Sequence, residues 1–375
     1  MYELHVHLDG SIRRETLFEL GKLYNVAIPK QFGFRDGMGL SAALSMFQLT
    51  VSLMQDKDII KRLVEELCDD LYHDGVEYAE IRYAPHLHGD RLEEIVSSSC
   101  DGLRYGYKII LCGLYGYSPQ YMETLVELAK KYDNVVGIDI AGGPSDNDKY
   151  GLHDYVDAFQ EAKKYNIGRT VHVSEGRSPQ EIIDAVLMLD AQRLGHACTI
   201  LESNEAIEIV KDRKVVIEAC PTSNVHTGIY RNVLQHPIKK WIEKKIPVTV
   251  CADNTLMSRT TTTTELLNFN FNEEELAWIF KSGYLGSFKN MKKELQDKLY
   301  EKYPKLYAQK DLDMRQTAMC WGIACGDGWY NIIDNLSQVI QDRSDWLNGE
   351  GIHTYRDVKV VKINLHGREQ NNGKL

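Results

Sequence analysis

Two histidines and an aspartate alternate with apolar residues near the start of the chain, in residues 3–10 (ELHVHLDG). Successive side chains of a strand point to opposite faces, so we expect His5, His7 and Asp9 on one face and the apolar residues on the other. Two imidazoles two residues apart on a strand can share a metal ion. Two core histidines bonded to backbone carbonyls would show the same spacing, so this segment alone leaves both interpretations open.

Further polar residues lie where other apolar, strand-like segments end. A histidine in a buried strand is often only a packed core residue, and Asp-Asn after a strand is often a turn. Packing does not require all of these residues at segment ends, however, so together they indicate an active site. The set comprises His5, His7, Gly142, His172, Ser174, Glu175, His196, Asp253 and Asn254.

The segments that carry these residues predict the fold. Short runs of β-branched and aromatic residues alternate with amphipathic helical sequence along most of the chain. Parallel strands need long crossover connections, and eight strands each followed by helical sequence predict a (β/α)8 barrel of the TIM type, whose chemistry lies at the carboxyl ends of the strands. The predicted strands are residues 3–8, 76–83, 108–114, 135–140, 169–174, 192–196, 215–220 and 247–251.

Helix starts have their own signals. Ser118-Pro119 and Ser178-Pro179 each combine a capping hydroxyl with a proline at the first helical position, and Asn272 offers another cap. Glu181 and Glu275 are expected to bond back to their caps. The threonine run at residues 260–264 is expected to form a solvated turn or a helix entry.

The pattern changes near residue 311. Residues 319–330 are rich in glycine and aromatic residues, residues 331–341 have a helical pattern, and residues 357–365 alternate like a strand. We therefore predict a barrel domain at residues 1–310 and a small C-terminal α+β module of unknown role at residues 311–375. Cys320 and Cys325 have no second pair, which favours two packed thiols over a zinc site there.

The composition favours a protein that acts on small molecules. The 44 Lys and Arg residues against 54 Asp and Glu residues leave a net charge of −10, without a basic run interleaved with aromatics, so nucleic-acid binding is disfavoured. The eight scattered cysteines are typical of reduced, buried thiols. No apolar run could span a bilayer, and the chain opens directly on the first strand without a cleavable signal, so we expect a cytoplasmic protein. The oligomeric state is left open.

Several motifs, in order from residue 1 to about residue 305, resemble the adenosine deaminase family of the metal-dependent amidohydrolases. Five of them carry the likeness: residues 5–11 (HVHLDGS), 170–175 (TVHVSE), 193–196 (RLGH), 220–224 (CPTSN) and 252–254 (ADN). Residues 78–85 (YAEIRYAP) and 136–142 (VGIDIAG) are also similar to the family pattern.

The resemblance implies a catalytic zinc ion, which lowers the pKa of a bound water from 15.7 to roughly 7 and so prepares it for attack on C6 of a purine. Glu175 would protonate ring N1, His196 would orient the nucleophile and stabilise the developing charge, and Asp253 would accept the proton of the water. Ammonia would leave and inosine would remain. The implied ligands of the one zinc ion per chain are His5, His7, His172 and Asp253.

The resemblance also assigns substrate recognition to His7, to Asp9 at the ribose 5′-hydroxyl, to Gly142 at purine N3 and to Asn254 at N7. Adenine deaminases of the superfamily tend to have glutamate at position 9 and N6-methyl-AMP deaminases asparagine, so aspartate favours a nucleoside with a free 5′-hydroxyl; it would also repel a phosphate. We expect zinc-dependent deamination of adenosine and 2′-deoxyadenosine. A deaminase of an N6-modified or phosphorylated adenine nucleoside, or an inactive barrel serving as a binding or assembly subunit, remains an alternative.

Three features depart from the family pattern. Gly143-Pro144 replaces the usual Asp-Glu, and Asp253-Asn254 replaces the two aspartates of many members. The amide of Asn254 can still donate to N7 without a protonated acid. Almost nothing precedes the first strand, so the segment that closes the barrel floor is expected to be absent or supplied from elsewhere.

Overall fold

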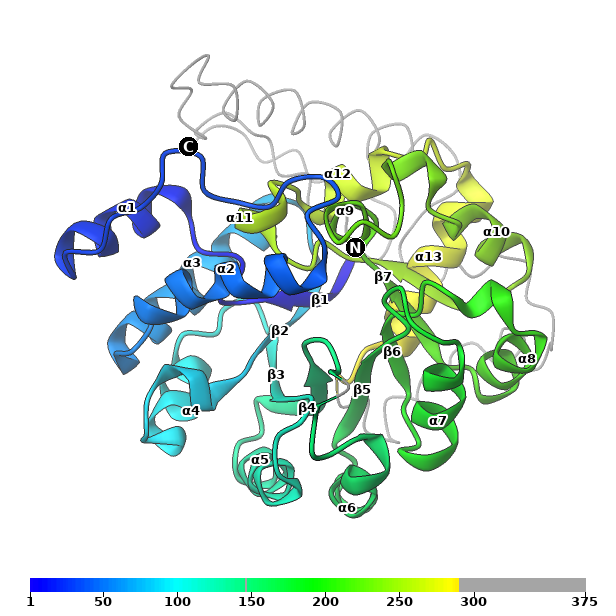
Figure 1. Cartoon of the computed structure of the whole chain (residues 1–375), viewed down its shortest axis with the longest axis horizontal. Helices are drawn as coiled ribbons and strands as arrows, with labels where there is room; N and C mark the ends of the chain where they lie inside the picture. The colour runs from blue at the N-terminus through cyan, green and yellow to red at the C-terminus, as the bar shows by residue number, and fades with distance from the viewer. Residues whose placement is uncertain (146, 290–375) are drawn as a thin grey trace, which may run out of the picture. The chain divides into compact units, whose positions relative to one another are not determined.

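Eight parallel strands form one sheet in the computed structural model, which describes residues 1–145 and 147–289. The strands pair in chain order, and a parallel bridge between Val6 and Asp253 closes the ring between the last strand and the first (Figure 1). The predicted TIM-type barrel is therefore confirmed. The strands are β1 (Tyr2–His7), β2 (Tyr78–Tyr83), β3 (Lys108–Leu114), β4 (Val135–Ala141), β5 (Gly168–Val173), β6 (Arg193–His196), β7 (Val216–Ala219) and β8 (Val248–Val250).

Helices α3 to α8 lie outside the ring of strands (Figure 1). The α-helices are α1 (Arg14–Leu23), α2 (Leu40–Ser52), α3 (Lys57–His73), α4 (Leu92–Asp101), α5 (Pro119–Lys131), α6 (Val156–Lys164), α7 (Gln180–Met188), α8 (Asn204–Arg213), α9 (Pro221–His226), α10 (Ile238–Glu243), α11 (Thr255–Ser258), α12 (Thr262–Leu267) and α13 (Glu273–Gly286). Four short 3-10 helices are η1 (Pro85–His88), η2 (Leu152–Tyr155), η3 (Ile200–Glu202) and η4 (Val233–Gln235).

Helix α3 illustrates why these segments cover the barrel. Its buried residues Ile60, Leu63, Val64, Leu67 and Leu71 recur at three- and four-residue spacing and so form one apolar stripe. Asp56, the residue before the helix, caps the first turn, because its carboxylate accepts a hydrogen bond from the backbone N–H of Asp58. Apolar periodicity and a polar cap together thus specify a helix that packs one face against the strands.

Two of the three predicted helix starts are confirmed, whereas α7 begins at Gln180, one residue later than predicted. The predicted capping bond of the Ser118 hydroxyl is not formed, and a predicted glutamate contact is also wrong. Helices α5 and α13 begin as expected, and Asn272 and Glu275 form the reciprocal capping box. Glu181 does not bond back to its own helix cap. Its carboxylate instead accepts from the backbone N–H of Ser174 at 2.8 Å and pairs with Arg177 at 2.6 Å. This glutamate therefore fixes the loop after β5.

The threonine run does enter helix α12, with Thr261 as its cap, but it is not solvated. Thr260 to Thr263 are all buried. Their hydroxyls bond to buried acidic residues and backbone: Thr262 donates to Glu3 at 2.6 Å and Thr260 donates to Glu265 at 2.7 Å. Buried carboxylates need such donors, so the run is a set of internal hydrogen-bond partners.

Strand β1 departs from simple alternation at one place. Its register against β2 shifts between Glu3 and Val6, which marks a bulge. Val6 and Leu8 pack in the main core as expected, but Leu4 packs in a separate cluster with barrel residues Tyr78, Cys220 and Cys251. The expectation that Leu4 shares the outer face is therefore wrong, whereas His5 and His7 both reach the interior.

Phe288, just after α13, closes the barrel at the amino ends of the strands. The guanidinium of Arg193 lies 3.6 Å from the centre of the Phe288 ring. The backbone N–H of Phe288 donates to the carboxylate of Glu80 at 2.5 Å. Arg193 also donates to the carbonyl of Gly286 at 2.9 Å. The end of α13 and Phe288 therefore cover this end of the barrel interior.

The proposed module at residues 311–375 lies outside the described residues. Within residues 1–145 and 147–289, every helix is too short or too polar to span a bilayer. The cysteines in this part of the chain are free thiols, and all except Cys100 are buried.

Candidate metal centre

The predicted ligands meet at the carboxyl ends of the strands. His5 and His7 come from β1, His172 from β5, and Asp253 follows β8. Two sets of side chains offer ligand atoms that all lie within 4.8 Å of one another: His5, His7 and His172, and His5, His196 and Asp253. The five side chains therefore lie together, although His5 and His7 are each more than 150 residues from the other three in the chain.

The distances fit a shared cation. The Nε2 atom of His7 lies 3.3 Å from Nε2 of His5 and 3.2 Å from Nε2 of His172. The Oδ1 atom of Asp253 lies 3.5 Å from Nε2 of both His5 and His7. Ligands about 2.0–2.1 Å from one ion in tetrahedral geometry are separated by about 3.3 Å. The four side chains therefore have the spacing of a coordination site.

The protonation of the rings supports the same conclusion. His5 donates from Nδ1 to Glu218 at 2.7 Å, and His172 donates from Nδ1 to Asp139 at 3.2 Å. When such a ring is neutral its single ring proton is on Nδ1, so Nε2 carries a lone pair directed at the shared point. Burial lowers the pKa of His7 well below its usual value and so favours the neutral form of that ring. Lone pairs this close to one another repel unless a cation lies between them.

A buried network orients the two rings. Arg82 donates to Asp139 and to Glu218, at 2.9 Å each, and its second nitrogen also reaches the carbonyl of Leu4. One guanidinium therefore holds both carboxylates that fix His5 and His172. All of these side chains except that of His172, which is 7 % exposed, are fully buried. Such partners raise the basicity of ligating histidines and fix their tautomer.

Replacing Glu218 by glutamine is expected to lower metal affinity by about 10- to 100-fold, because His5 then loses its carboxylate partner. Competition with a calibrated chelator measures the change. Glu80→Gln is the matched control: Glu80 is equally buried and bonds to Arg193, Tyr78 and the backbone of Phe288, but it contacts no ligand. Equal loss of metal in both variants would show that the effect is a general consequence of removing a buried charge.

Glu175 lies beside this cluster with the character of an acid. Burial, reinforced by the negative charge of Asp253, raises the pKa of Glu175 to about 7. Its Oε2 atom is 3.7 Å from Nε2 of His196, the residue that ends β6. A carboxyl group with this pKa can carry and donate a proton at neutral pH. The structure thus brings the predicted acid next to the predicted ligands.

Backbone strain accompanies these placements. Ser174, His196 and Asp253 all have positive φ angles, of 52°, 64° and 61°. Side chains other than glycine rarely adopt this conformation, and each such residue costs of order 1 kcal/mol or more. The turns occur where β5, β6 and β8 end, and they direct Glu175, His196 and Asp253 towards the common point.

Asp9, Gly142 and Asn254, which are predicted to bind substrate, lie at the same rim, after β1, β4 and β8. Asp9 and Asn254 are buried, and one side-chain oxygen of each has no hydrogen-bond partner among the described residues. Burial raises the pKa of Asp9 to about 7. Unpaired buried polar atoms are costly, and both of these oxygens can accept a hydrogen bond from a ligand. The predicted contact of Asn254 with purine N7 would instead use its amide nitrogen, which donates.

Two glycines at this rim have different structural roles. A Cβ atom on Gly10 would lie 1.8 Å from Oδ1 of Asn254, so only glycine allows the asparagine side chain to occupy this position. Gly142 has a φ of 79°, which glycine adopts without strain. Its backbone N–H, at the end of β4, remains the predicted contact for the purine.

Sequence reasoning missed Glu218 and gave no role to Arg82 or Asp139. Arg82 and Asp139 lie within two of the family-like motifs, and Glu218 is a charged residue inside the apolar strand β7. The charge of Glu218 within an apolar strand could have indicated a buried ion-pair partner, because a buried charge requires one.

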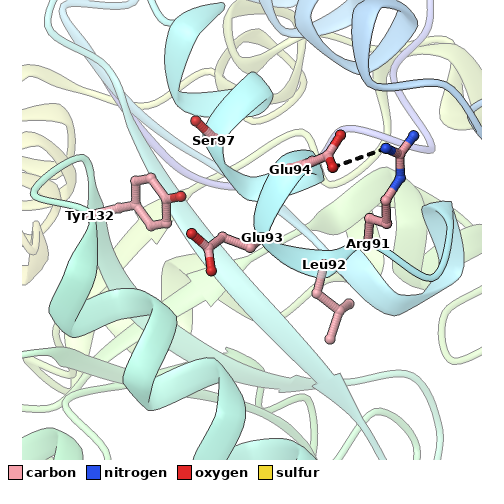
Figure 2. A pocket seen from close by; sticks show the side chains of 6 residues that line it. All are labelled: Arg91, Leu92, Glu93, Glu94, Ser97 and Tyr132. Carbon is pink, nitrogen blue, oxygen red and sulfur yellow. Dashed lines mark hydrogen bonds and ion pairs between the residues drawn. The ribbon is translucent and has the colours of Figure 1, made fainter.

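A hollow of about 500 Å³ on the outer surface is separate from this cluster (Figure 2). It is lined by α4 and by Tyr132, the residue after α5, and Arg91 forms an ion pair with Glu94 at its edge, at 2.9 Å. None of the predicted site residues lines it.

Comparison with known proteins gives consistent matches. The family model described as adenosine deaminase matches residues 1–302. The chain is 32% identical over 326 residues to an adenosine deaminase of Clostridium kluyveri, covering 80% of this chain and 92% of that protein. It is 33% identical over 310 residues to an adenosine deaminase of Vibrio atlanticus, covering 76% and 92%.

A solved structure shares the fold. The structure of an Arabidopsis N6-mAMP deaminase has a TM-score of 0.68 with this chain at 23% identity, and the match covers 81% of this chain and 97% of that one. At this identity the likeness concerns the architecture of the barrel.

Proposed function

Because the chain belongs to the adenosine deaminase family and is a deaminase, we propose that it hydrolyses adenosine and 2′-deoxyadenosine to inosine and 2′-deoxyinosine, with one bound zinc ion and release of ammonia. The observation that carries the proposal is the convergence of three imidazole Nε2 atoms and the Asp253 carboxylate at 3.2–3.5 Å, with Glu175 beside them.

His5, His7, His172 and Asp253 would hold the zinc ion. Three nitrogens and one oxygen are a ligand set that zinc accepts readily. When bound, zinc lowers the pKa of a coordinated water to about 7 and so supplies a nucleophile at neutral pH. Asp253 would bind the ion through its ionised carboxylate, which is also the form that can accept a proton from the water.

Glu175 is proposed to protonate N1 of the purine. Protonation there withdraws electrons from C6 and favours addition at that carbon, and a positioned acid contributes about 10² to 10⁴ in rate. His196, next to Glu175, would stabilise the charge that develops on the attacking oxygen. The intact set of ligands with an acid beside it disfavours an inactive barrel, since a binding protein has no need of that acid.

Asp9, Gly142 and Asn254 are proposed to select the nucleoside, together with His7. The unpaired oxygen of Asp9 suits the ribose 5′-hydroxyl, and the same carboxylate would repel a 5′-phosphate. A panel of adenosine, 2′-deoxyadenosine, AMP, N6-methyl-AMP and adenine, followed by the absorbance change as adenine becomes hypoxanthine, tests this choice. Faster turnover of either nucleotide than of adenosine would overturn it.

Asp9→Ala is expected to raise KM for adenosine by about 10- to 100-fold with little change in kcat, because the buried 5′-hydroxyl loses its hydrogen-bond partner. The control is a substrate analogue, 5′-deoxyadenosine, which lacks the hydroxyl that Asp9 is proposed to bind. Steady-state kinetics should therefore show a much smaller effect of the substitution on 5′-deoxyadenosine. An equal effect on both nucleosides would mean that Asp9 does not bind this hydroxyl.

The expected cytoplasmic location and the absence of a nucleic-acid partner stay predictions from composition and cysteine usage.

A further inference from the structure

The motif at residues 220–224 has no part in the function described so far, although it ends next to the reacting groups. Its last residue, Asn224, is fully buried on α9, the short helix that follows β7. Its Nδ2 atom lies 3.1 Å from Nδ1 of His196 and 3.4 Å from Oε1 of Glu175. One amide thus contacts both the proposed proton donor and the proposed charge-stabilising histidine.

The backbone of Asn224 is held firmly. Its N–H donates to the carbonyl of Cys220 at 3.0 Å, and its own carbonyl accepts from Ile229 at 3.0 Å and from Tyr230 at 3.3 Å. A side chain on so constrained a backbone, with no exposed surface, has little freedom to choose other partners. Its contacts with Glu175 and His196 are therefore a fixed part of the fold.

The direction of these hydrogen bonds determines where His196 carries its proton. The amide nitrogen has two hydrogens, and a carboxylate oxygen and an imidazole nitrogen are its two neighbours. An Nδ1 atom that accepts has no proton, so a neutral His196 is protonated at Nε2. Rotating the amide by 180° would place its oxygen against the Glu175 carboxylate and remove both donors from their acceptors.

We propose that Asn224 is a positioning residue that keeps the proton of His196 on Nε2 and holds His196 and Glu175 at a fixed separation. This rests on the proposed deaminase function and adds a residue to it. Nε2 of His196 faces Glu175, with 3.7 Å to Oε2, so a proton there is directed at the space in which the reaction is proposed. His196 then donates a hydrogen bond to the attacking oxygen, and the role of proton acceptor falls to Asp253.

The tautomer can be read directly in the unsubstituted protein. Nitrogen-15 chemical shifts of the histidine rings distinguish a protonated from an unprotonated ring nitrogen, and the signals of His196 are identified by their loss in His196→Gln. The proposal predicts a protonated Nε2 and an unprotonated Nδ1. The opposite tautomer would overturn it, and this outcome does not depend on the folding of an Asn224 variant.

Asn224→Asp tests the consequence for turnover. Aspartate has the same shape but only accepts hydrogen bonds, so it should draw the His196 proton to Nδ1 and place a second carboxylate beside Glu175. We expect kcat to fall by about 10- to 100-fold, with KM within about threefold of the parent and the metal content unchanged. Asn224→Ala removes the donor without supplying an acceptor, so His196 should populate both tautomers and kcat should fall less than in Asn224→Asp.

Ser223→Ala, a buried neighbour on the same helix, is the control for disturbance of α9 and should keep the parent kcat. Parent-like kcat in Asn224→Asp would contradict the proposal, as would an equal loss in Ser223→Ala. If the parent protein deaminates no adenine nucleoside, the proposed function fails, whereas the tautomer measurement still decides the position of the proton.

Discussion

Replacing Glu175 by glutamine is expected to leave the metal bound and to lower kcat by about 10²- to 10⁴-fold, which is the contribution of a positioned acid. Glutamine keeps the size of the side chain and can still accept from Asn224, but it cannot give a proton to the purine. Metal analysis and steady-state kinetics on the same sample separate loss of the ion from loss of the acid.

Glu265→Gln is the matched control for that experiment. Burial raises the pKa of Glu265 to about 7, as it does for Glu175, but Glu265 bonds to Thr222 and Thr260 and contacts none of the proposed reacting groups. The control is expected to keep the parent kcat. A Glu175→Gln variant that turns over as fast as the parent would exclude protonation of the purine by this residue.

Asp253→Asn is expected to reduce both metal affinity and turnover, with kcat lower by at least about 10³-fold, since a ligand and a proton acceptor are lost together. Asparagine tolerates the positive φ at this position. Two backbone hydrogen bonds that close the barrel remain possible in this variant: the N–H of His7 donates to the carbonyl of residue 253, and the N–H of residue 253 donates to the carbonyl of His5. The loss should therefore reflect the missing carboxylate.

Asn254→Ala serves as the neighbouring control for metal binding. It removes a side chain that is proposed to contact the purine but none of the ligand atoms, so stoichiometric metal should remain. Asp253→Asn protein that retains parent affinity for the ion would remove Asp253 from the coordination set.

Strand geometry allowed much of the centre to be predicted from sequence. Alternation in residues 3–10 placed His5 and His7 together, and the repeated strand-helix pattern placed His172 and Asp253 at the same rim. These predictions needed only local periodicity and the rule that parallel barrel strands present their carboxyl ends on one face.

The supporting network could not be predicted in this way. His5 and Glu218 are 213 residues apart, and Arg82 and Glu218 are 136 apart, so no local pattern joins them. Their pairing depends on inward-facing registers of different strands, and the register of β1 itself changes at a bulge. The same dependence on tertiary contact explains the buried threonines of α12 and the closing of the barrel by Phe288.

The most direct test of the account is a metal titration of the purified protein after removal of bound ions with a chelator. Adenosine turnover should be absent in the stripped protein and should recover in proportion to added zinc, with a break at about one ion per chain. Full turnover by protein that contains no metal, or a break at a stoichiometry other than one, would contradict a single cation held by three imidazoles and one carboxylate.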